Sequence, residues 1–532
     1  MPTLSFESHK FVWKGTFDDR VHAQRSNFSF DAKGGVWISD DMYKALRLIN
    51  FADDSALRIL LPVEEAIEAS AALSSTISVP AIDGCFYLPF QLAGIENMAK
   101  RRVSFLADDM GVGKTIQAIG LSNYCGFESN LIIVPASLRI KWFREWTKWA
   151  VAPNGFSAQY IVGSNTIWTL ASGKNMHALI MSYESAVSRY RELMELGRWD
   201  HIILDEAHYL KNPEAKRTKA ILGDLFDPDG PPGLISRSDK VTLLSGTPIP
   251  NRANEFFPML RNLVPNVLGK RYMYYGKFLN QFCQWFNGDH GIIVTGSKNE
   301  WELGNRLRGS GFMTRRVKSA VLPDLPDKRH ILVEMVPDAP IKKILEKEKP
   351  FDPEEILRIG AAAFPALPQI RKEMGIAKIK LILEYVKMML EGVEKVIVGT
   401  IHREVAKSLY ATFKQDKYNP AIIIGETNLN KRQYAVDKFQ TDPTCRVFIG
   451  NLQAAGEGHD LTASSEVILA EPDWSPHRNN QFIDRSHRKG QKSGVQVHYL
   501  VVSGSLDAHI LSTAIEKESG INKILDGDLN GD

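Results

Sequence analysis

"VSFLADDMGVGKTIQAIGLSNY", residues 103–124, joins a short apolar run to a helix-like segment through a glycine-rich turn. A phosphate-binding loop has this order, because N–H groups at a helix N-terminus bind the phosphate while a lysine reaches the β and γ phosphates. The letters GVGKT at 111–115 match the end of the pattern G-x-x-x-x-G-K-[ST], but Asp108 stands at its first glycine. Alone, this match leaves open a helix start that carries these residues by chance. The order of strand, loop and helix favours a nucleotide site.

Similar apolar runs occur in two groups along the chain. Runs rich in Val, Ile and Leu between polar, helix-like segments are typical of parallel strands that are buried on both faces and joined by crossover helices. Each group is large enough for one open α/β lobe, and the strand-end loops of two such lobes border a ligand-binding cleft. The first group comprises 103–107, 131–136, 178–183, 201–206 and 241–247, and the second comprises 395–400, 421–426, 446–451, 466–471 and 495–502.

The remaining segments differ from these two lobes. The first 75 or so residues contain aromatic runs and a Gly-Gly turn, which predict a small β-rich region, followed by a polar helix around 64–75. Between the lobes the strand-like runs give way to an aromatic, proline-bearing stretch, which we interpret as helical. We therefore divide the chain into a small N-terminal α+β region (1–78), an ATP-binding lobe (79–265), a helical insertion and connector (266–375), a C-terminal lobe (376–515) and a tail (516–532).

Composition excludes several classes of protein. A chain of 532 residues is too long for one hydrophobic core, and its 44% hydrophobic and 24% charged residues are typical of a globular protein. The four cysteines form no C-x-x-C pair, which argues against a zinc module or a disulfide framework and favours a reducing compartment. We expect no export signal and no membrane span. Lys and Arg exceed Asp and Glu only by 65 to 62, so any polyanion site must come from local clustering.

"HIILDEAH", residues 201–208, ends a buried strand with the carboxylates of Asp205 and Glu206. A buried charge is costly unless a cation is paired with it. Magnesium supplies such a cation, so we expect Asp205 to coordinate it and Glu206 to orient or deprotonate the attacking water. The two acids could instead lie at a helix N-terminus, where negative charge is favourable. The phosphate-binding pattern earlier in the chain favours the catalytic interpretation.

Five stretches extend the pattern: "LADDMGVGKT" (106–115), "DEAHYLKNP" (205–213), "LLSGTPIPN" (243–251), "AAGEGHDLTAS" (454–464) and "QFIDRSHRKGQ" (481–491). Their order and spacing resemble the Swi/Snf-type ATPases of helicase superfamily two, in which an acidic residue commonly stands at the position of Asp108. The resemblance covers about 80–515 and implies an α/β fold of two tandem RecA-like parallel-sheet lobes with helical insertions. The chain resembles most the HepA-related branch of annealing helicases and fork remodellers, and its compact architecture indicates a bacterial or bacteriophage member.

The resemblance also implies the residues of an ATP and magnesium site. Gln91 would read the adenine edge, because its amide offers both a donor and an acceptor. Arg485 and Arg488 lie three residues apart, hence on one helix face, and would stabilise charge on the transferring phosphoryl group; a solvated basic helix face is the alternative. The implied catalytic residues are Lys114, Asp205, Glu206, Arg485 and Arg488, and the implied magnesium ligands are Thr115 and Asp205. The implied nucleotide-binding residues are Gln91, Asp109, Met110, Gly111, Val112, Gly113, Lys114, Thr115, Ile116, Gly456 and Gly458.

In the family that the chain resembles, the two lobes hold duplex DNA. The resemblance implies ATP-driven movement along double-stranded or branched DNA through phosphate contacts, which carry no sequence specificity. We expect a monomer with no membrane partner, and the sequence leaves a protein partner open. We expect it to be cytoplasmic in a bacterium or phage-infected host and nuclear in a eukaryote. Arg315, Arg316 and Lys318 could touch phosphate or brace acidic partners inside the protein, and the sequence favours neither. Further candidates for phosphate contacts at strand ends are Ser137, Arg139, Lys141, His402 and Arg403.

Other functions fit parts of the pattern. One is a strand-separating DNA helicase, or the motor component of a repair or restriction complex. Another is a nucleotide-gated binding protein with little turnover, which the joint presence of Lys114, Asp205, Glu206 and both arginines disfavours. A small-molecule kinase would leave the second lobe unexplained. The N-terminal region could recognise branched DNA, dock a partner or brace the first lobe, and its aromatic and apolar residues favour the brace.

Overall fold

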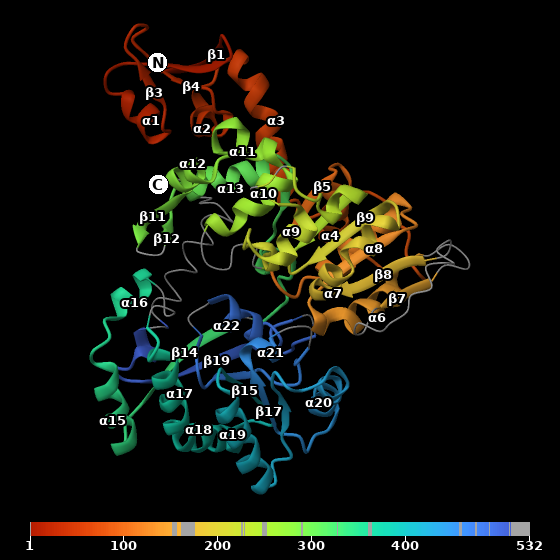
Figure 1. The fold of residues 1–532 in the computed structure, drawn as a ribbon, viewed down its shortest axis with the longest axis vertical. Coiled ribbons are helices and arrows are strands. Elements are labelled where there is room, and N and C mark those ends of the chain that lie inside the picture. Colours follow the sequence, from red (N-terminus) through yellow and green to blue (C-terminus); the bar gives the residue numbers. More distant parts are fainter. Residues whose placement is uncertain are drawn as a thin grey trace.

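Two parallel α/β lobes, a small N-terminal region and a group of helices beside the first lobe make up the chain (Figure 1). The tail expected at 516–532 lies outside the described residues. The computed structural model describes residues 2–151, 157–160, 176–224, 227, 229–246, 253–288, 291–326, 328–359, 364–456, 460–473, 476–488, 490–509 and 511.

The first lobe is built on a seven-stranded sheet in which all neighbouring strands are parallel. Because the strands are parallel, the residues that follow β5 and β9 lie at the same end of the sheet, where the strands terminate. The strand order is β13 (Met313–Thr314), β5 (Val103–Leu106), β10 (Ser238–Leu244), β9 (Trp199–Asp205), β6 (Asn130–Val134), β8 (Met176–Ser182) and β7 (Ser157–Tyr160). Its helices are α4 (Pro89–Ala99), α5 (Lys114–Cys125), α6 (Arg139–Trp149), α7 (Tyr183–Ser188), α8 (Tyr190–Glu195) and α9 (Lys216–Leu222).

The second lobe has a six-stranded sheet that is also entirely parallel. Its strand order is β14 (Lys328–Met335), β19 (Val495–Val502), β18 (Glu466–Leu469), β15 (Val396–Thr400), β17 (Val447–Asn451) and β16 (Ala421–Ile423). The helices around it are α15 (Ala339–Glu348), α16 (Pro353–Ile359), α17 (Leu367–Ala377), α18 (Ile379–Gly392), α19 (Arg403–Gln415), α20 (Leu429–Thr441), α21 (Leu452–Ala455) and α22 (Pro476–Ile483).

Alternation of side chains along each strand gives both sheets a core on each face. In β9, Ile202 and Leu204 are buried in one cluster of the first lobe, whereas Ile203 is buried in the cluster on the other face. In β15, Val396 and Ile397 divide in the same way between the two clusters of the second lobe. A strand that is buried on both faces is a continuous apolar run. The α/β fold with two parallel lobes and the ten expected strands are therefore confirmed.

The N-terminal region is a four-stranded antiparallel sheet with helices, as the sequence predicts. It packs on α13 (Glu300–Gly309), where the buried Arg306 pairs with Asp41 and with Glu302. The Arg306 guanidinium also lies 4.8 Å from the ring centre of Tyr43. The region is thus fixed to the first lobe's helices. Its elements are β1 (Thr3–Glu7), β2 (Lys10–Lys14), α1 (Arg20–Arg25), β3 (Ser29–Asp31), β4 (Val36–Ser39), α2 (Met42–Ala45) and α3 (Asp54–Ser70).

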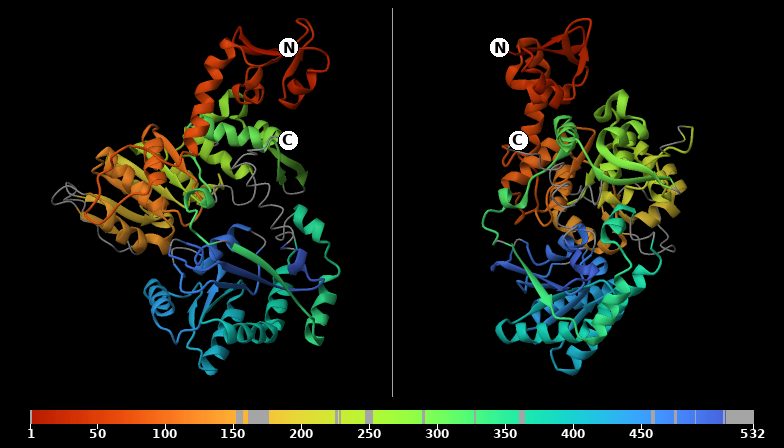
Figure 2. Two further views of the ribbon diagram at one scale, coloured as in Figure 1. Left: turned by 180° about the vertical axis from the view of Figure 1, so that it is seen from behind. Right: turned by 90° about the vertical axis from the view of Figure 1, so that its left-hand side faces the viewer.

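The segment 266–375 is not purely helical, which differs from the expectation. Strand β13 joins the sheet of the first lobe and β14 joins that of the second. Strand β14 lies at a sheet edge and carries charged residues, so its sequence lacks the continuous apolar run of a central strand. The chain crosses between the lobes from β13 to β14 (Figure 2). Helices α10 (Phe257–Leu263) and α11 (Pro265–Tyr272) begin before this segment, and it also contains α12 (Tyr275–Phe282), β11 (Cys283–Gly288), β12 (Gly291–Ser297) and α14 (Lys318–Val321).

Candidate active site

The glycine-rich turn between β5 and α5 holds a half-buried lysine at a helix N-terminus. Gly113 caps α5 with a φ of 87°, in the left-handed region that favours glycine, and a Cβ atom there would lie 2.6 Å from Gln91 Nε2. Lys114 Nζ donates to the carbonyl oxygens of Asp108 and Asp109, each at 2.9 Å. Burial lowers the pKa of Lys114. A phosphate group would favour the charged form of this lysine, so the turn fits the β and γ phosphates of a nucleotide.

Gln91 lies on α4 beside this turn and is 4% exposed. Its Nε2 atom donates to the carbonyl oxygen of Val112 at 3.2 Å, and the backbone N–H of Leu88 donates to its Oε1 atom at 2.9 Å. An amide has two N–H donors and two acceptor lone pairs, so these two bonds use one of each. The backbone thus fixes the amide orientation, and the second donor and lone pair can meet an adenine edge.

Asp205 ends β9 with both carboxylate oxygens hydrogen-bonded. Trp142 Nε1 of α6 donates to Asp205 Oδ2 at 2.7 Å, and the backbone N–H of Glu206 donates to Oδ1 at 2.9 Å. Burial and the charge of Glu206 raise the pKa of Asp205. A divalent cation would offset both effects, so the carboxylate fits the magnesium expected here. The role of Trp142 had no signal in the sequence, where it is one apolar position of an amphipathic helix.

Glu206 has an unusual backbone, with a φ of 49° in the left-handed region. This conformation costs on the order of 1–3 kcal/mol for a residue other than glycine, and such strain concentrates at functional sites. The carboxylate oxygen Oε1 accepts a hydrogen bond from Gln481 Nε2 of α22 at 3.5 Å. Its buried Oε2 lies 3.3 Å from His208 Nδ1 and accepts no hydrogen bond from any described residue. The Glu206 carboxylate is thus held between α22 of the second lobe and His208 of the first.

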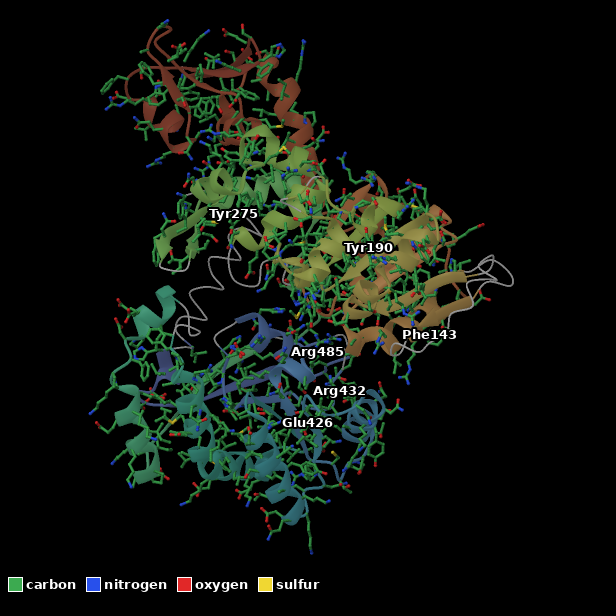
Figure 3. All side chains as sticks on the ribbon, in the orientation of Figure 1. Phe143, Tyr190, Tyr275, Glu426, Arg432 and Arg485 are labelled. Atoms are coloured by element: carbon green, nitrogen blue, oxygen red, sulfur yellow. The ribbon has the colours of Figure 1, made fainter. Side chains whose placement is uncertain are left out.

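Two arginines of the second lobe reach the phosphate-binding turn of the first. They follow α22, and Figure 3 shows Arg485 where the second lobe faces the first. Arg488 Cγ lies only 3.2 Å from the position of a Cβ atom on Gly111, and its guanidinium pairs with Asp460. Burial and the charge of Arg488 lower the pKa of Arg485 to about 9. Both arginines therefore lie close together beside the expected phosphates.

These groups line one cleft of about 420 Å³ between the lobes. Asp109 and Gly456 do not line its described part. The Asp109 carboxylate binds residues 315 and 318, and Gly456 ends α21 and donates its N–H to the carbonyl oxygen of Leu452. Gly458 lies outside the described residues. The expected residues that line the cleft are Gln91, Met110, Gly111, Val112, Gly113, Lys114, Thr115, Ile116, Asp205, Glu206, Arg485 and Arg488.

Asp108, at the position of the missing glycine, is completely buried and paired with Arg316. Arg316 Nη2 donates to Asp108 Oδ2 at 2.6 Å, and Arg316 Nε donates to Oδ1 at 3.0 Å. The neighbouring Arg315 pairs with Asp109 at 3.0 Å. Between the two roles that the sequence left open, both arginines take the internal one. The aspartate therefore ties the phosphate-binding turn to the chain that leaves the first lobe.

Replacing Arg316 with methionine is expected to lower the free energy of unfolding of the first lobe by about 3–5 kcal/mol, because it leaves Asp108 buried without its cation. Urea unfolding followed by circular dichroism measures this change. Lys100→Met breaks the exposed pair with Glu96 at 2.9 Å and should cost about 1 kcal/mol or less. Similar losses in the two variants would contradict a stabilising role of the Asp108–Arg316 pair.

The other candidates for phosphate contacts differ in how far they are exposed. Lys141 lies in the cleft, 3.8 Å from Asp460, rather than on an outer surface. Burial and the charge of Arg488 lower its pKa to about 8. His402 Nδ1 lies 2.7 Å from Glu471 Oε1. Arg139 is buried, Ser137 is half-buried after β6, and Arg403 is exposed after β15.

Two known protein families match the two lobes that form this cleft. A SNF2-related domain matches residues 90–348, and a helicase conserved C-terminal domain matches residues 377–490. The chain belongs to the SNF2-related family. The first match includes Lys114 and Glu206, and the second includes both arginines. Membership of this family implies that the chain uses a nucleotide.

Curated relatives of the SNF2-related chain occur in animals and bacteria. The human "DNA annealing helicase and endonuclease ZRANB3" is 31% identical over 79% of this chain. The Xenopus tropicalis "SWI/SNF-related matrix-associated actin-dependent regulator of chromatin subfamily A-like protein 1" is 29% identical over 93%, and an "Uncharacterized ATP-dependent helicase" of Mycoplasma pneumoniae is 29% identical over 80%. The matches span 38%, 52% and 40% of these relatives, respectively.

Among solved structures, the "Sulfolobus solfataricus SWI2/SNF2 ATPase core in complex with dsDNA" aligns with 86% of this SNF2-related chain and 96% of that chain, with 22% identity and a TM-score of 0.40. Within the described part of the chain, every helix is too short or too polar to cross a membrane.

Proposed function

We propose that this chain hydrolyses ATP in a DNA-dependent reaction and moves along double-stranded or branched DNA without reading its sequence. The observation that carries the proposal is the cleft that joins Lys114 and Glu206 of the first lobe to Arg485 and Arg488 of the second. A site that needs residues from both lobes is complete only when the lobes are together. Hydrolysis and release of product can therefore drive their relative movement.

The residues of the cleft have complementary parts in the hydrolysis of ATP. Water attacks the γ-phosphorus, the bond to the bridging oxygen of ADP breaks, and the water proton passes to the carboxylate of Glu206. Lys114 and the arginines, with Arg488 the stronger candidate, stabilise the negative charge on the transferring group. When bound, magnesium would supply further positive charge to the reacting phosphates, and the Thr115 hydroxyl and the Asp205 carboxylate are the groups that would hold it.

Two considerations support DNA as the polymer. The human relative is named a DNA annealing helicase, and movement driven by a two-lobed motor needs a polymer that both lobes hold. Arg403 on the second lobe is exposed after a strand end, and Ser137 on the first lobe is half-buried at a similar position. Contacts from such residues to phosphate give affinity without base recognition. Sequence-independent binding follows from this chemistry.

The test is ATP hydrolysis by the purified chain with no polymer, single-stranded DNA, duplex DNA, a branched fork or RNA. Duplex or fork DNA is expected to stimulate hydrolysis most, and Glu206→Gln should remove the stimulated activity. Intact ATP binding with no stimulation by any nucleic acid would contradict the proposal. Separation of a labelled duplex under the same conditions would instead favour a strand-separating helicase.

A further inference from the structure

The linker between the lobes, residues 315–326, contacts the phosphate-binding turn at its start. Two carboxylates of the turn bind it. Asp108 holds Arg316 in the buried pair described above, and Asp109 Oδ2 accepts the backbone N–H of Lys318 at 2.8 Å. These residues lie a few positions before Lys114, so the first part of the linker is fixed to the turn that would hold the phosphates.

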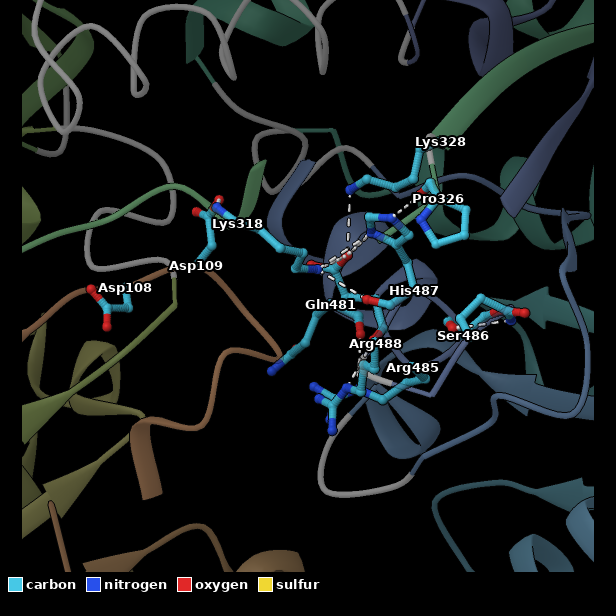
Figure 4. A network of polar contacts seen from close by, with 12 residues as sticks. Asp108, Asp109, Lys318, Pro326, Lys328, Gln481, Arg485, Ser486, His487 and Arg488 are labelled. Carbon is cyan, nitrogen blue, oxygen red and sulfur yellow. Dashed lines mark hydrogen bonds and ion pairs between the residues drawn. The ribbon is translucent and has the colours of Figure 1, made fainter. Parts of the chain in front are cut away.

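The same linker contacts the segment that carries the two arginines. Lys318 Nζ donates to Asp484 Oδ1 at 2.9 Å and to the carbonyl oxygen of His487 at 3.1 Å. Figure 4 shows the Lys318 side chain extending from the linker toward His487. Farther along, the carbonyl oxygen of Pro326 lies 2.7 Å from His487 Nε2. The linker is thus bound to two segments that carry cleft residues and belong to different lobes.

Asp484 connects this contact to Arg488 within one helical turn. Its carbonyl oxygen accepts a hydrogen bond from Arg488 Nε at 2.9 Å, so its position bears directly on that guanidinium. The side chains of Lys318 and Asp484 are 8% and 9% exposed. Lys328, which is 28% exposed, also contacts Asp484 Oδ1, at 3.3 Å. Asp484 therefore has two cations, and only Lys318 is also bound to the phosphate-binding turn by its backbone.

We propose that Lys318 is a positioning residue, through which the linker holds Arg485 and Arg488 in register with the phosphate-binding turn. This inference rests on the proposed ATP hydrolysis. The backbone N–H of Lys318 is bound to Asp109 and moves with it, and the Lys318 side chain is bound to Asp484 and His487. A displacement of the turn on nucleotide binding therefore moves the arginine segment through one residue. A misplacement of about 1 Å at reacting groups can cost on the order of 100-fold in rate.

The first test separates turnover from nucleotide binding. Lys318→Met retains the backbone contact to Asp109 and removes the contacts to Asp484 and His487. We expect turnover with duplex DNA to fall by about tenfold or more, while the dissociation constant of a fluorescent ATP analogue changes by less than about threefold. Lys318→Arg keeps the charge and should recover most of the turnover. An unchanged turnover, or an equal loss of binding, would overturn the proposal.

Lys328→Met is the matched control, because it removes the other lysine that contacts Asp484 Oδ1. We expect it to lower turnover by less than about threefold, the effect of a partly exposed ion pair. If Lys318→Met and Lys328→Met lower turnover equally, Lys318 is only a counter-ion for Asp484 and the proposal fails.

Hydrogen exchange tests the linker without relying on hydrolysis. In the wild-type chain, a non-hydrolysable ATP analogue should slow exchange of the backbone amides of 485–488. In Lys318→Met this protection should be lost, while protection of 109–113 by the same analogue remains. Equal protection of 485–488 in both proteins would overturn the proposal. A wild type that protects 485–488 but hydrolyses no ATP would refute the proposed function alone.

Discussion

Replacing Glu206 with glutamine is expected to abolish ATP turnover and leave nucleotide binding intact. The amide has the size of the carboxylate but cannot accept the proton of the attacking water, a loss of about 10²–10⁴-fold in rate. Glu206 lines the same cleft as Lys114 and both arginines, which is the position that this role requires. Phosphate release with duplex DNA measures turnover, and titration with a fluorescent ATP analogue measures binding.

Glu214→Gln is a control for the same chemical change in the same lobe. Glu214 pairs with Lys219 at 3.0 Å, and its side chain is 64% exposed. We expect this variant to keep the wild-type turnover. Turnover of Glu206→Gln within about tenfold of wild type would contradict its role as the proton acceptor, because that loss is smaller than general base catalysis provides.

The strands were predictable where their environment is uniform. A central strand such as β9 is buried on both faces, so its residues are mostly apolar. Asp205 is the last residue of this strand and therefore lies at its C-terminal end. Among the described strands, β14 pairs only with β19, and its Lys328, Arg329 and Glu334 interrupt the apolar pattern. Strand β13 has two residues, too few for any periodicity. These edge strands were missed because tertiary pairing rather than local sequence determines them.

Some features of the candidate site were also predictable from the sequence, whereas others were not. The turn around Lys114 and the pair of Asp205 and Glu206 are local patterns, so the sequence identified them, and their catalytic roles stay predictions. The partner of Asp108 is Arg316, 208 residues away, and Trp142 bonds to Asp205 across 63 residues. Only the fold brings such residues together. Local sequence indicates which chemistry is present, whereas the contacts that orient it depend on the three-dimensional arrangement.

Replacing Arg488 with alanine is expected to lower the turnover number by about 10³-fold or more, the effect of removing an arginine that stabilises phosphoryl transfer. Arg488 lies against Gly111 and pairs with Asp460. Phosphate competes with this carboxylate for the guanidinium, so the arginine can transfer from Asp460 to the nucleotide. Arg488→Lys should also be impaired, because an ammonium group lacks the planar pair of donors. Single-turnover hydrolysis at saturating ATP and duplex DNA measures the chemical step.

Arg478→Ala on α22 controls for the loss of an arginine near the same cleft. Arg478 pairs with Asp473 at 3.0 Å and is 47% exposed, so we expect little change in turnover. Arg485→Ala provides the more informative comparison, because Arg485 is 4% exposed and donates from Nε to the carbonyl oxygen of Gln481. If Arg485→Ala loses far more turnover than Arg488→Ala, then Arg485 is the main stabilising cation and Arg488 serves the Asp460 contact. Comparable large losses would mean that the two guanidinium groups act on the phosphates together.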